Sequence, residues 1–598
     1  MRYEVTRQGA DEGARDAERD GGQQLSPLRE AELSLRGRGG ATCTDGPQLF
    51  EGEPNQVLDP STGDGGTGSP SDAALSRGTR PPGGARGGRP HRAGEQPFTP
   101  LKSEESDPFS ASEALYLGVV GFLSGEEAKG LTHSELEARL DVEGRELLRQ
   151  LFQDHLDLRS ICEVRAEEVR DATNRYHRSV EQGHRRPLET IFGSVGVTRL
   201  AYRAKGSKNL YLGDAGLNLP EEIHSHGLRE LGAIEGSRGS YEEAQVGIKR
   251  STGVCLGKRQ LEELAARAAT DVEEFYSRAT RDLTTDSDTL VISCDGKGIV
   301  MRPGELRGAT KRAAKTTNHK LKTRLTSGEK KDRKRMAELS VVYDCSPVPR
   351  SPAEVMARSG DCPKTAGPVA KAKWLTASVA EDARKVIEAA FLEAERRDPG
   401  HLRPWVALVD GNNHQINRIK TEAKKRGVDI TIVINWIHVV EYLWGAARCF
   451  FKEADPKGEA FVARKAQAVL EGKAGIVAGS LRRKATMCHL DAKSRQKVDE
   501  CARYLQNKSP YLDYPKALAS GWPIATGVIE GACAHLVKDR FDVTGARWSV
   551  KGAEAILKLR AVRANGDWPE YFEFHLTQEH MRVHESCYAD GVIPEAAR

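Results

Sequence analysis

The sequence lacks several features that would assign it to a common class. No stretch of its 598 residues approaches the ~18 consecutive apolar residues of a membrane span, and the polar N-terminus has no hydrophobic secretory core. The eleven cysteines are scattered from Cys43 to Cys587 without a Cys-x-x-Cys pair. This argues against a zinc ribbon and against a disulfide framework. We therefore expect a protein of the reducing cytoplasm with no membrane partner.

An overall excess of charge is also missing, because the net charge is only +4. The local distribution is more informative: residues 302–335 contain 13 Lys or Arg and three Asp or Glu. Such a block suits a polyanion such as DNA. A solvated surface loop has the same composition, so both interpretations stay open. Candidate phosphate contacts in the block are Lys311, Arg312, Lys320, Lys322 and Arg324.

The length predicts three or four domains, at roughly 100 to 200 residues each. Gly, Pro and Arg dominate the first hundred residues, which predicts a disordered segment. It is either a basic tether or the result of a translation start set too far upstream. The predicted order is a disordered tail (1–105), a helical region (106–185), a β-hairpin with a helix-turn-helix (186–283), the first part of an α/β core (284–450), a helical insertion (451–521) and the last part of the core with C-terminal helices (522–598).

Helical patterns begin near Ser110, and Thr132 with Glu135 forms a predicted capping box. We expect helices to continue to about Gln182. Residues 190–202 alternate in the manner of a strand, and we expect them to pair with residues 209–212 across a turn at Lys205-Gly206.

Residues 240–261 read as helix, Gly-containing turn and helix, with Lys258 and Arg259 opening the second helix. This pattern is typical of a helix-turn-helix whose second helix enters a DNA groove. Any two-helix turn in a bundle looks similar, so both interpretations remain.

From residue 286 the periodicity alternates between strand and helix. Strands are predicted at 289–294, 298–302, 336–343, 405–409 and 429–434, and helices at 377–397 and 415–426. The order βββαβαβ is that of an α/β, ribonuclease H-like domain. In that topology the first and fourth strands are neighbours.

One acidic residue follows each of these two strands: Asp295 and Asp410. An Asp-Gly after a strand is usually only a turn, but two of them at neighbouring strand ends can form a site. Carboxylate oxygens suit Mg²⁺ or Mn²⁺, and two such ions about 3.5–4 Å apart can activate an attacking hydroxyl and stabilise a leaving oxygen. Glu530 is the candidate third ligand. Nearby candidate phosphate contacts are Lys297, Lys538 and Arg540.

Five stretches, 293–298, 407–415, 437–444, 525–533 and 545–548, resemble the ISKra family of bacterial insertion-sequence transposases. The resemblance runs from about residue 110 to the C-terminus. It implies a DDE transposase that uses two Mg²⁺ (or Mn²⁺) to nick element ends and to direct a 3′-hydroxyl onto target DNA. On the matching positions, Asp295, Asp410 and Glu530 would be the catalytic, metal-binding triad. The implied partners are terminal inverted repeats, target DNA and further copies of the chain, as a homodimer or larger homo-oligomer associated with the nucleoid.

Residues 435–438 match a Cys- or Asp-x-x-His motif that mutator-like transposases carry after the second aspartate. Asn435 departs from the aspartate that is usual in the family. If that position tunes the site electrostatically, activity is reduced; if it only fixes His438, little changes. His438 itself is either a core histidine or a site contact. Trp548, which follows Arg547, is either a core residue or a platform on which a DNA base stacks.

Two other functions fit the same residues. One is a nuclease of the same fold that cuts DNA without joining it. The other is a DNA-binding protein derived from an inactivated element.

Overall fold

The structure is a computed structural model that describes residues 107–280, 288–316, 333–357, 366–543 and 545–595. Over these ranges the chain is a mixed α/β protein, and from Pro108 on they belong to one compact unit. The predicted tail (1–105) and the candidate contacts Lys320, Lys322 and Arg324 lie outside the described residues. In the described part of the chain, no helix is both long and apolar enough to cross a membrane.

The first helices agree with the sequence. They are α2 (Ser110–Ser124), α3 (Glu126–Lys129) and α4 (His133–Ile161). The capping box is confirmed: the Thr132 hydroxyl accepts a hydrogen bond from the Glu135 amide, and the Glu135 carboxylate accepts one from the Thr132 amide at 2.8 Å.

The prediction of helices up to about Gln182 is wrong. A long antiparallel hairpin, β1 (Ser179–Thr190) with β2 (Gly193–Arg203), begins before that point. Its turn lies at residues 191–192 rather than at Lys205-Gly206, and the expected pairing with 209–212 is reduced to one bridge between Tyr202 and Leu210. The hairpin buries Leu188, Val195 and Val197 against Leu156 of α4, which allows the charged side chains of β1 to stay on its outer face.

A helical region follows, with α5 (Leu212–Gly216), α6 (His226–Arg238), α7 (Tyr241–Thr252), α8 (Lys258–Ala268) and α9 (Val272–Arg278). The predicted succession of helix, Gly-containing turn and helix is present as α7 and α8. Gly253 ends α7 in the left-handed conformation (φ 77°) that favours glycine, and α8 begins at Lys258.

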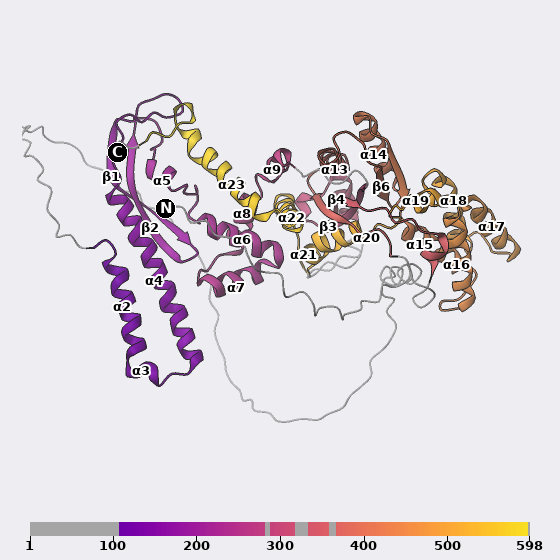
Figure 1. The fold of residues 1–598 in the computed structure, drawn as a ribbon, viewed down its shortest axis with the longest axis horizontal. Helices are drawn as coiled ribbons and strands as arrows, with labels where there is room; N and C mark the ends of the chain where they lie inside the picture. The colour runs from indigo at the N-terminus through magenta and orange to yellow at the C-terminus, as the bar shows by residue number, and fades with distance from the viewer. Residues whose placement is uncertain (1–106, 281–287, 317–332, 358–365, 544, 596–598) are drawn as a thin grey trace, which may run out of the picture. The chain divides into compact units, whose positions relative to one another are not determined.

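The next element of the fold is a five-stranded mixed sheet, part of which is labelled in Figure 1. Its strands are β3 (Thr289–Val300), β4 (Lys334–Cys345), β5 (Lys371–Ser378), β6 (Trp405–Val409) and β7 (Ile430–Ile434), in the order β5-β4-β3-β6-β7. β4 pairs antiparallel with both β3 and β5, whereas β3–β6 and β6–β7 are parallel. The expected adjacency of the strands that lead to Asp295 and Asp410 is confirmed.

Two strand assignments are corrected. The predicted strands 289–294 and 298–302 are one continuous strand, β3, and the third strand of the sheet is β5, which we did not predict. The segment Asp-Gly-Lys-Gly therefore runs through the sheet and does not turn. Its glycines suit this path, because a Cβ on Gly296 would come within 3.0 Å of Met336 Cε and one on Gly298 within 2.8 Å of Lys334 Cδ.

Helices connect and cover the sheet. α13 (Ala383–Arg397) begins at its cap Asp382, later than the predicted 377, and α14 (Asn413–Arg426) and α15 (Trp436–Ala447) follow β6 and β7. The predicted insertion is helical, with α16 (Pro456–Leu470), α17 (Ala474–Met487), α18 (Gln496–Asn507) and α19 (Tyr514–Ala519). The shorter helical segments are η1 (Pro303–Glu305), α10 (Gly308–Thr316), α12 (Pro352–Met356), η2 (Ser509–Tyr511), η4 (Glu585–Cys587) and η5 (Ala589–Gly591).

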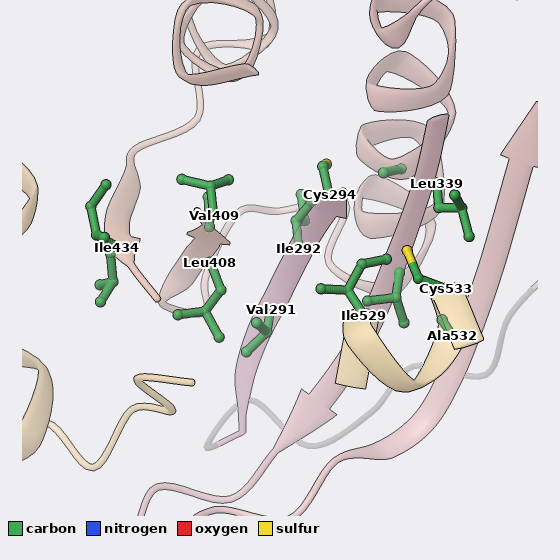
Figure 2. Packing of buried hydrophobic residues seen from close by; sticks show 14 of the residues in the cluster. Val291, Ile292, Cys294, Leu339, Leu408, Val409, Ile434, Ile529, Ala532 and Cys533 are labelled. Atoms are coloured by element: carbon green, nitrogen blue, oxygen red, sulfur yellow. The ribbon is translucent and has the colours of Figure 1, made fainter. Parts of the chain in front are cut away.

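The chain returns to the sheet through α20 (Gly527–Ala532), which continues as the π-helix η3 (Cys533–Lys538) and ends in α21 (Asp539–Phe541). Figure 2 shows Ile529 and Cys533 on the face of α20 and η3 that packs against the sheet residues Cys294 and Leu339. Irregular π turns within helices are frequent at functional sites. α22 (Val550–Asn565) and α23 (Trp568–Val583) complete the fold.

The turn after β6 depends on Gly411. Its φ is +88°, and a Cβ there would lie 2.9 Å from Ile434 Cδ1 and 3.0 Å from the Tyr504 hydroxyl. We expect Gly411→Ala to lower the free energy of unfolding by about 2 kcal/mol or more, because strain and overlap add. Urea denaturation measures this. Gly475→Ala is the matched control: a Cβ there meets nothing within 4 Å, so equal losses in both variants would contradict the argument.

Candidate active site

The sheet register aligns the polar residues of three neighbouring strands. Ser293 of β3 pairs with Leu408 of β6, so two residues later Asp295 lies level with Asp410. Val409 of β6 pairs with Ile434 of β7, so one residue later Asp410 lies level with Asn435. Because level residues of parallel strands share a face, these three side chains form one row across the sheet.

Asn435 joins the row to the helix that carries Glu530. Its side chain is buried (2% exposed), and its Nδ2 donates to Asp410 Oδ1 at 3.0 Å and to Glu530 Oε1 at 3.2 Å. Its Oδ1 accepts hydrogen bonds from the amides of Ile437 and Thr526, so the amide orientation is fixed. One amide group therefore holds two carboxylates side by side.

The helical segment that carries Glu530 also contacts Asp295. Cys533, three residues after Glu530, donates from Sγ to Asp295 Oδ2 at 3.3 Å. The amide of Gly296 donates to Asp295 Oδ1 at 2.7 Å, and the Thr526 hydroxyl donates to Glu530 Oε1 at 2.9 Å. The structure thus brings together Asp295, Asp410 and Glu530, which are spread over 236 residues of sequence.

The electrostatics of the row reflect crowding of like charges. Burial, reinforced by the nearby Asp410 carboxylate, raises the pKa of Asp295. Burial and the charge of Asp295 also raise the pKa of Glu338 on β4, a fourth carboxylate beside the row. A cation between these groups would relieve the repulsion.

The donor set fits hard divalent cations. Three carboxylates supply the oxygen ligands that Mg²⁺ and Mn²⁺ prefer. Asp410 Oδ2 and Glu530 Oε2 accept no hydrogen bond from any described residue, so each has an oxygen available for an ion. In the described conformation no three His, Cys, Asp or Glu side chains are close enough to form a ready metal cluster.

The insertion braces the turn that carries Asp410. The Tyr504 hydroxyl of α18 donates to the Asp410 carbonyl at 3.2 Å, and one helical turn later the buried Lys508 donates to the Asn413 side chain. His438 lies beside this brace. Its Nδ1 is 3.1 Å from Glu441 Oε2 and its ring packs edge-on against Tyr504. Among the described residues, His438 makes no hydrogen bond to the three carboxylates.

The predicted DNA contacts fall into two groups. Lys258, Arg259, Lys311, Arg312, Lys538 and Arg547 are exposed, with Lys258 paired to Glu242 and Arg259 to Glu263, and Lys297 is half-buried next to Asp295. Arg540 and Trp548 are buried, at 2% and 6% exposed. The ring centres of Trp548 and Phe541 lie 4.6 Å apart. Of the two interpretations of Trp548, the structure therefore favours a core residue over a base-stacking platform.

Several residues at the site had no predicted role. Cys533 and Thr526 lie within residues 525–533, the stretch from which Glu530 was predicted. Their contacts become visible only once α20 is placed against the sheet. Glu338 of β4 lies opposite Gly296 of β3. The sequence did not predict this pair, because it divided β3 into two strands with Gly296 between them. Tyr504 and Lys508 lie four residues apart in the sequence. This helical spacing indicates that they share one face of a helix, but it does not indicate what that face contacts.

Comparison with known proteins gives no family assignment. No protein-family model matches the chain. No curated protein matches it either. The functional argument therefore depends on the site itself.

The raised pKa of Asp295 makes a prediction about stability without metal. The folded state holds this proton more tightly than the unfolded state, so stability falls as pH rises from the ordinary value of 3.8 through the raised pKa. Asp295→Asn removes the charge. In a chelating buffer we expect the variant to melt at a higher temperature than the wild type at neutral pH, and the two to converge below pH 3.8. Thermal scans at both pH values test this; a variant that melts lower at neutral pH would contradict it.

Proposed function

We propose that the chain is a DDE-type transposase, which nicks DNA at the ends of an insertion sequence and joins the freed 3′-hydroxyl to target DNA in a metal-dependent reaction. The observation that carries the proposal is the bridge from Asn435 Nδ2 to both Asp410 and Glu530, in line with Asp295. Two carboxylates from neighbouring strands lie level with each other, and the Asn435 amide links one of them to the carboxylate of the helix. This is the arrangement that the resemblance to the ISKra family implies.

The strand order supports the same proposal. Numbered along the chain within the sheet, the strands lie in the order 3-2-1-4-5, with only the second antiparallel to its neighbours. That is the order expected of a ribonuclease H-like core. The helical insertion between β7 and α20 accounts for the 120 residues that separate Asp410 from Glu530.

The residues of the chain have distinct parts in the proposed reaction. Asp295, Asp410 and Glu530 would hold two divalent ions, which when bound supply charge stabilisation for the attacking and leaving oxygens of a phosphodiester. The Asn435 amide orients Asp410 and Glu530, and Tyr504 fixes the main chain at Asp410. Cys533 and Gly296 orient Asp295. The nucleophile is a water or a DNA hydroxyl, so the protein's contribution is positioning.

A joining assay tests the proposal. The full chain is incubated with Mn²⁺ and DNA from the regions that flank its own reading frame, and the products are sequenced. The proposal predicts nicks at fixed positions and joined products, both lost in chelator. Nicking without joining would indicate the nuclease alternative, and binding without any cleavage would indicate the DNA-binding alternative.

A further inference from the structure

A basic hollow of about 760 Å³ lies apart from the carboxylate row. It is lined by α7 and α8 of the helix-turn-helix and by the segment after α21, with Arg302 from the end of β3. Five cations line it, against two acids, Glu242 and Glu262. The cations are Lys258, Arg259, Arg302, Arg540 and Arg547. Four of these were candidate DNA contacts on separate segments of the sequence, and the fold brings them to one place.

Both acids of the hollow already have partners within the protein. Glu242 pairs with Lys258, and Glu262 lies 3.7 Å from Arg302 and accepts a hydrogen bond from Ser549. No described carboxylate lies within 4.0 Å of the guanidinium of Arg540 or Arg547. The hollow therefore keeps a positive charge that the protein itself does not neutralise.

Arg540 is the most unusual of these cations. It is 2% exposed, and its only described hydrogen bond runs from Nε to the Gly236 carbonyl at 3.0 Å. Its guanidinium lies over the rings of Tyr241 and Trp548, at 5.0 and 4.6 Å from their centres. Aromatic faces attract a cation, but a buried charge without an acid is costly.

Three buried hydrogen-bonding atoms that belong to the lining have no partner among the described residues. They are Arg540 Nη2, Trp548 Nε1 and the Tyr241 hydroxyl. Burial raises the pKa of Tyr241 to about 12, so its hydroxyl keeps its proton and can donate. A buried donor left unpaired costs about 1–3 kcal/mol. One of the three belongs to the Arg540 cation and the other two to the rings beneath it, and an oxyanion supplies the acceptor oxygens that all three lack.

We propose that this hollow binds backbone phosphate of DNA, held jointly by the start of α8 and by Arg540, Arg547 and Trp548. The inference rests on the proposed function for the identity of its ligand. It adds a specific contact: DNA read by the helix-turn-helix would also touch the segment that continues from the Glu530 helix. Arg540 lies ten residues beyond Glu530, on the continuous run α20–η3–α21. The hollow and Glu530 are thus joined by one helical segment.

Binding measured in chelator, where no cleavage occurs, tests the inference. Fluorescence anisotropy of the full chain with a labelled duplex is recorded over a range of salt concentrations. Arg547→Ala is expected to reduce the slope of log affinity against log salt by about 1, for element-flanking and random duplexes alike. Lys205→Ala is the matched control, because Lys205 is exposed but does not line the hollow.

Tyr241→Phe and Trp548→Phe test the unpaired donors. Each keeps an aromatic ring and removes one O–H or N–H, so we expect DNA affinity to fall roughly tenfold. The unfolding temperature of Tyr241→Phe should stay the same or rise, whereas that of Trp548→Phe should fall because the smaller ring leaves space in the core. A lower unfolding temperature for Tyr241→Phe would show that its hydroxyl has a protein partner, which would overturn the inference. Wild-type affinity and salt slope in Arg547→Ala and both Phe variants would also overturn it. A wild-type chain that binds no DNA would instead contradict the proposed function.

Discussion

Asp410→Asn is expected to slow Mn²⁺-dependent nicking by roughly 10³-fold or more, which corresponds to about 4 kcal/mol of transition-state stabilisation. The variant keeps the size of the side chain, and its oxygen can still accept the hydrogen bond from Asn435. It loses the negative charge that would hold a cation at the centre of the row. DNA affinity in chelator should not fall, because Asp410 itself is not a predicted DNA contact.

Asp429→Asn is the control for this experiment. Asp429 is an exposed carboxylate just before β7, at the other end of the strand from Asn435. The same chemical change there should leave nicking at the wild-type rate. If Asp410→Asn retained more than a tenth of the wild-type rate, Asp410 could not be a metal ligand of the reaction.

Asn435→Ser is expected to lower nicking by about 10- to 100-fold, the range typical of residues that orient metal ligands. Serine preserves the cap of α15, where the Asn435 side chain accepts from the Ile437 amide. Its short hydroxyl cannot reach Asp410 and Glu530 together, so the two carboxylates lose their common donor. The unfolding temperature should therefore change little while the rate falls. Wild-type activity in this variant would show that the bridge does not orient the site.

Asn435→Asp separates the two roles that the sequence left open for this position. Aspartate keeps the shape and the cap but replaces the donor by an acceptor, beside Asp410 and Glu530, at a position that is 2% exposed. In chelator this variant should unfold at a lower temperature than the wild type, and Mn²⁺ should stabilise it more than the wild type. Identical responses to Mn²⁺ would show that the position does not act electrostatically.

The two aspartates of the site were predictable because they follow apolar strands, and parallel pairing brings equal register positions to one level. The path of β3 was not, because Asp-Gly-Lys-Gly has the composition of a turn. Here the side chains of Met336 and Lys334 cross over the glycines and keep the strand extended. β5 was missed because its first half, Lys-Ala-Lys, is exposed at the sheet edge.

For α20, the sequence predicted which residue belongs to the site but not how that residue is placed. Glu530 was singled out by its motif, but its contact with Asn435 depends on how the helix returns to the sheet after the insertion. Arg540 was predicted only as a candidate phosphate contact, and its burial was not predicted. Its burial follows from Tyr241 and Trp548, which belong to segments 300 residues apart in sequence and enclose it only in the fold.

The most direct measurement is an anomalous difference map from crystals of the full chain soaked in Mn²⁺. The account predicts two peaks about 3.5–4 Å apart, bounded by Asp295, Asp410 and Glu530, and loss of at least one peak in Asp410→Asn. A map in which Mn²⁺ occupies other sites and no peak lies at these three carboxylates would contradict the central claim.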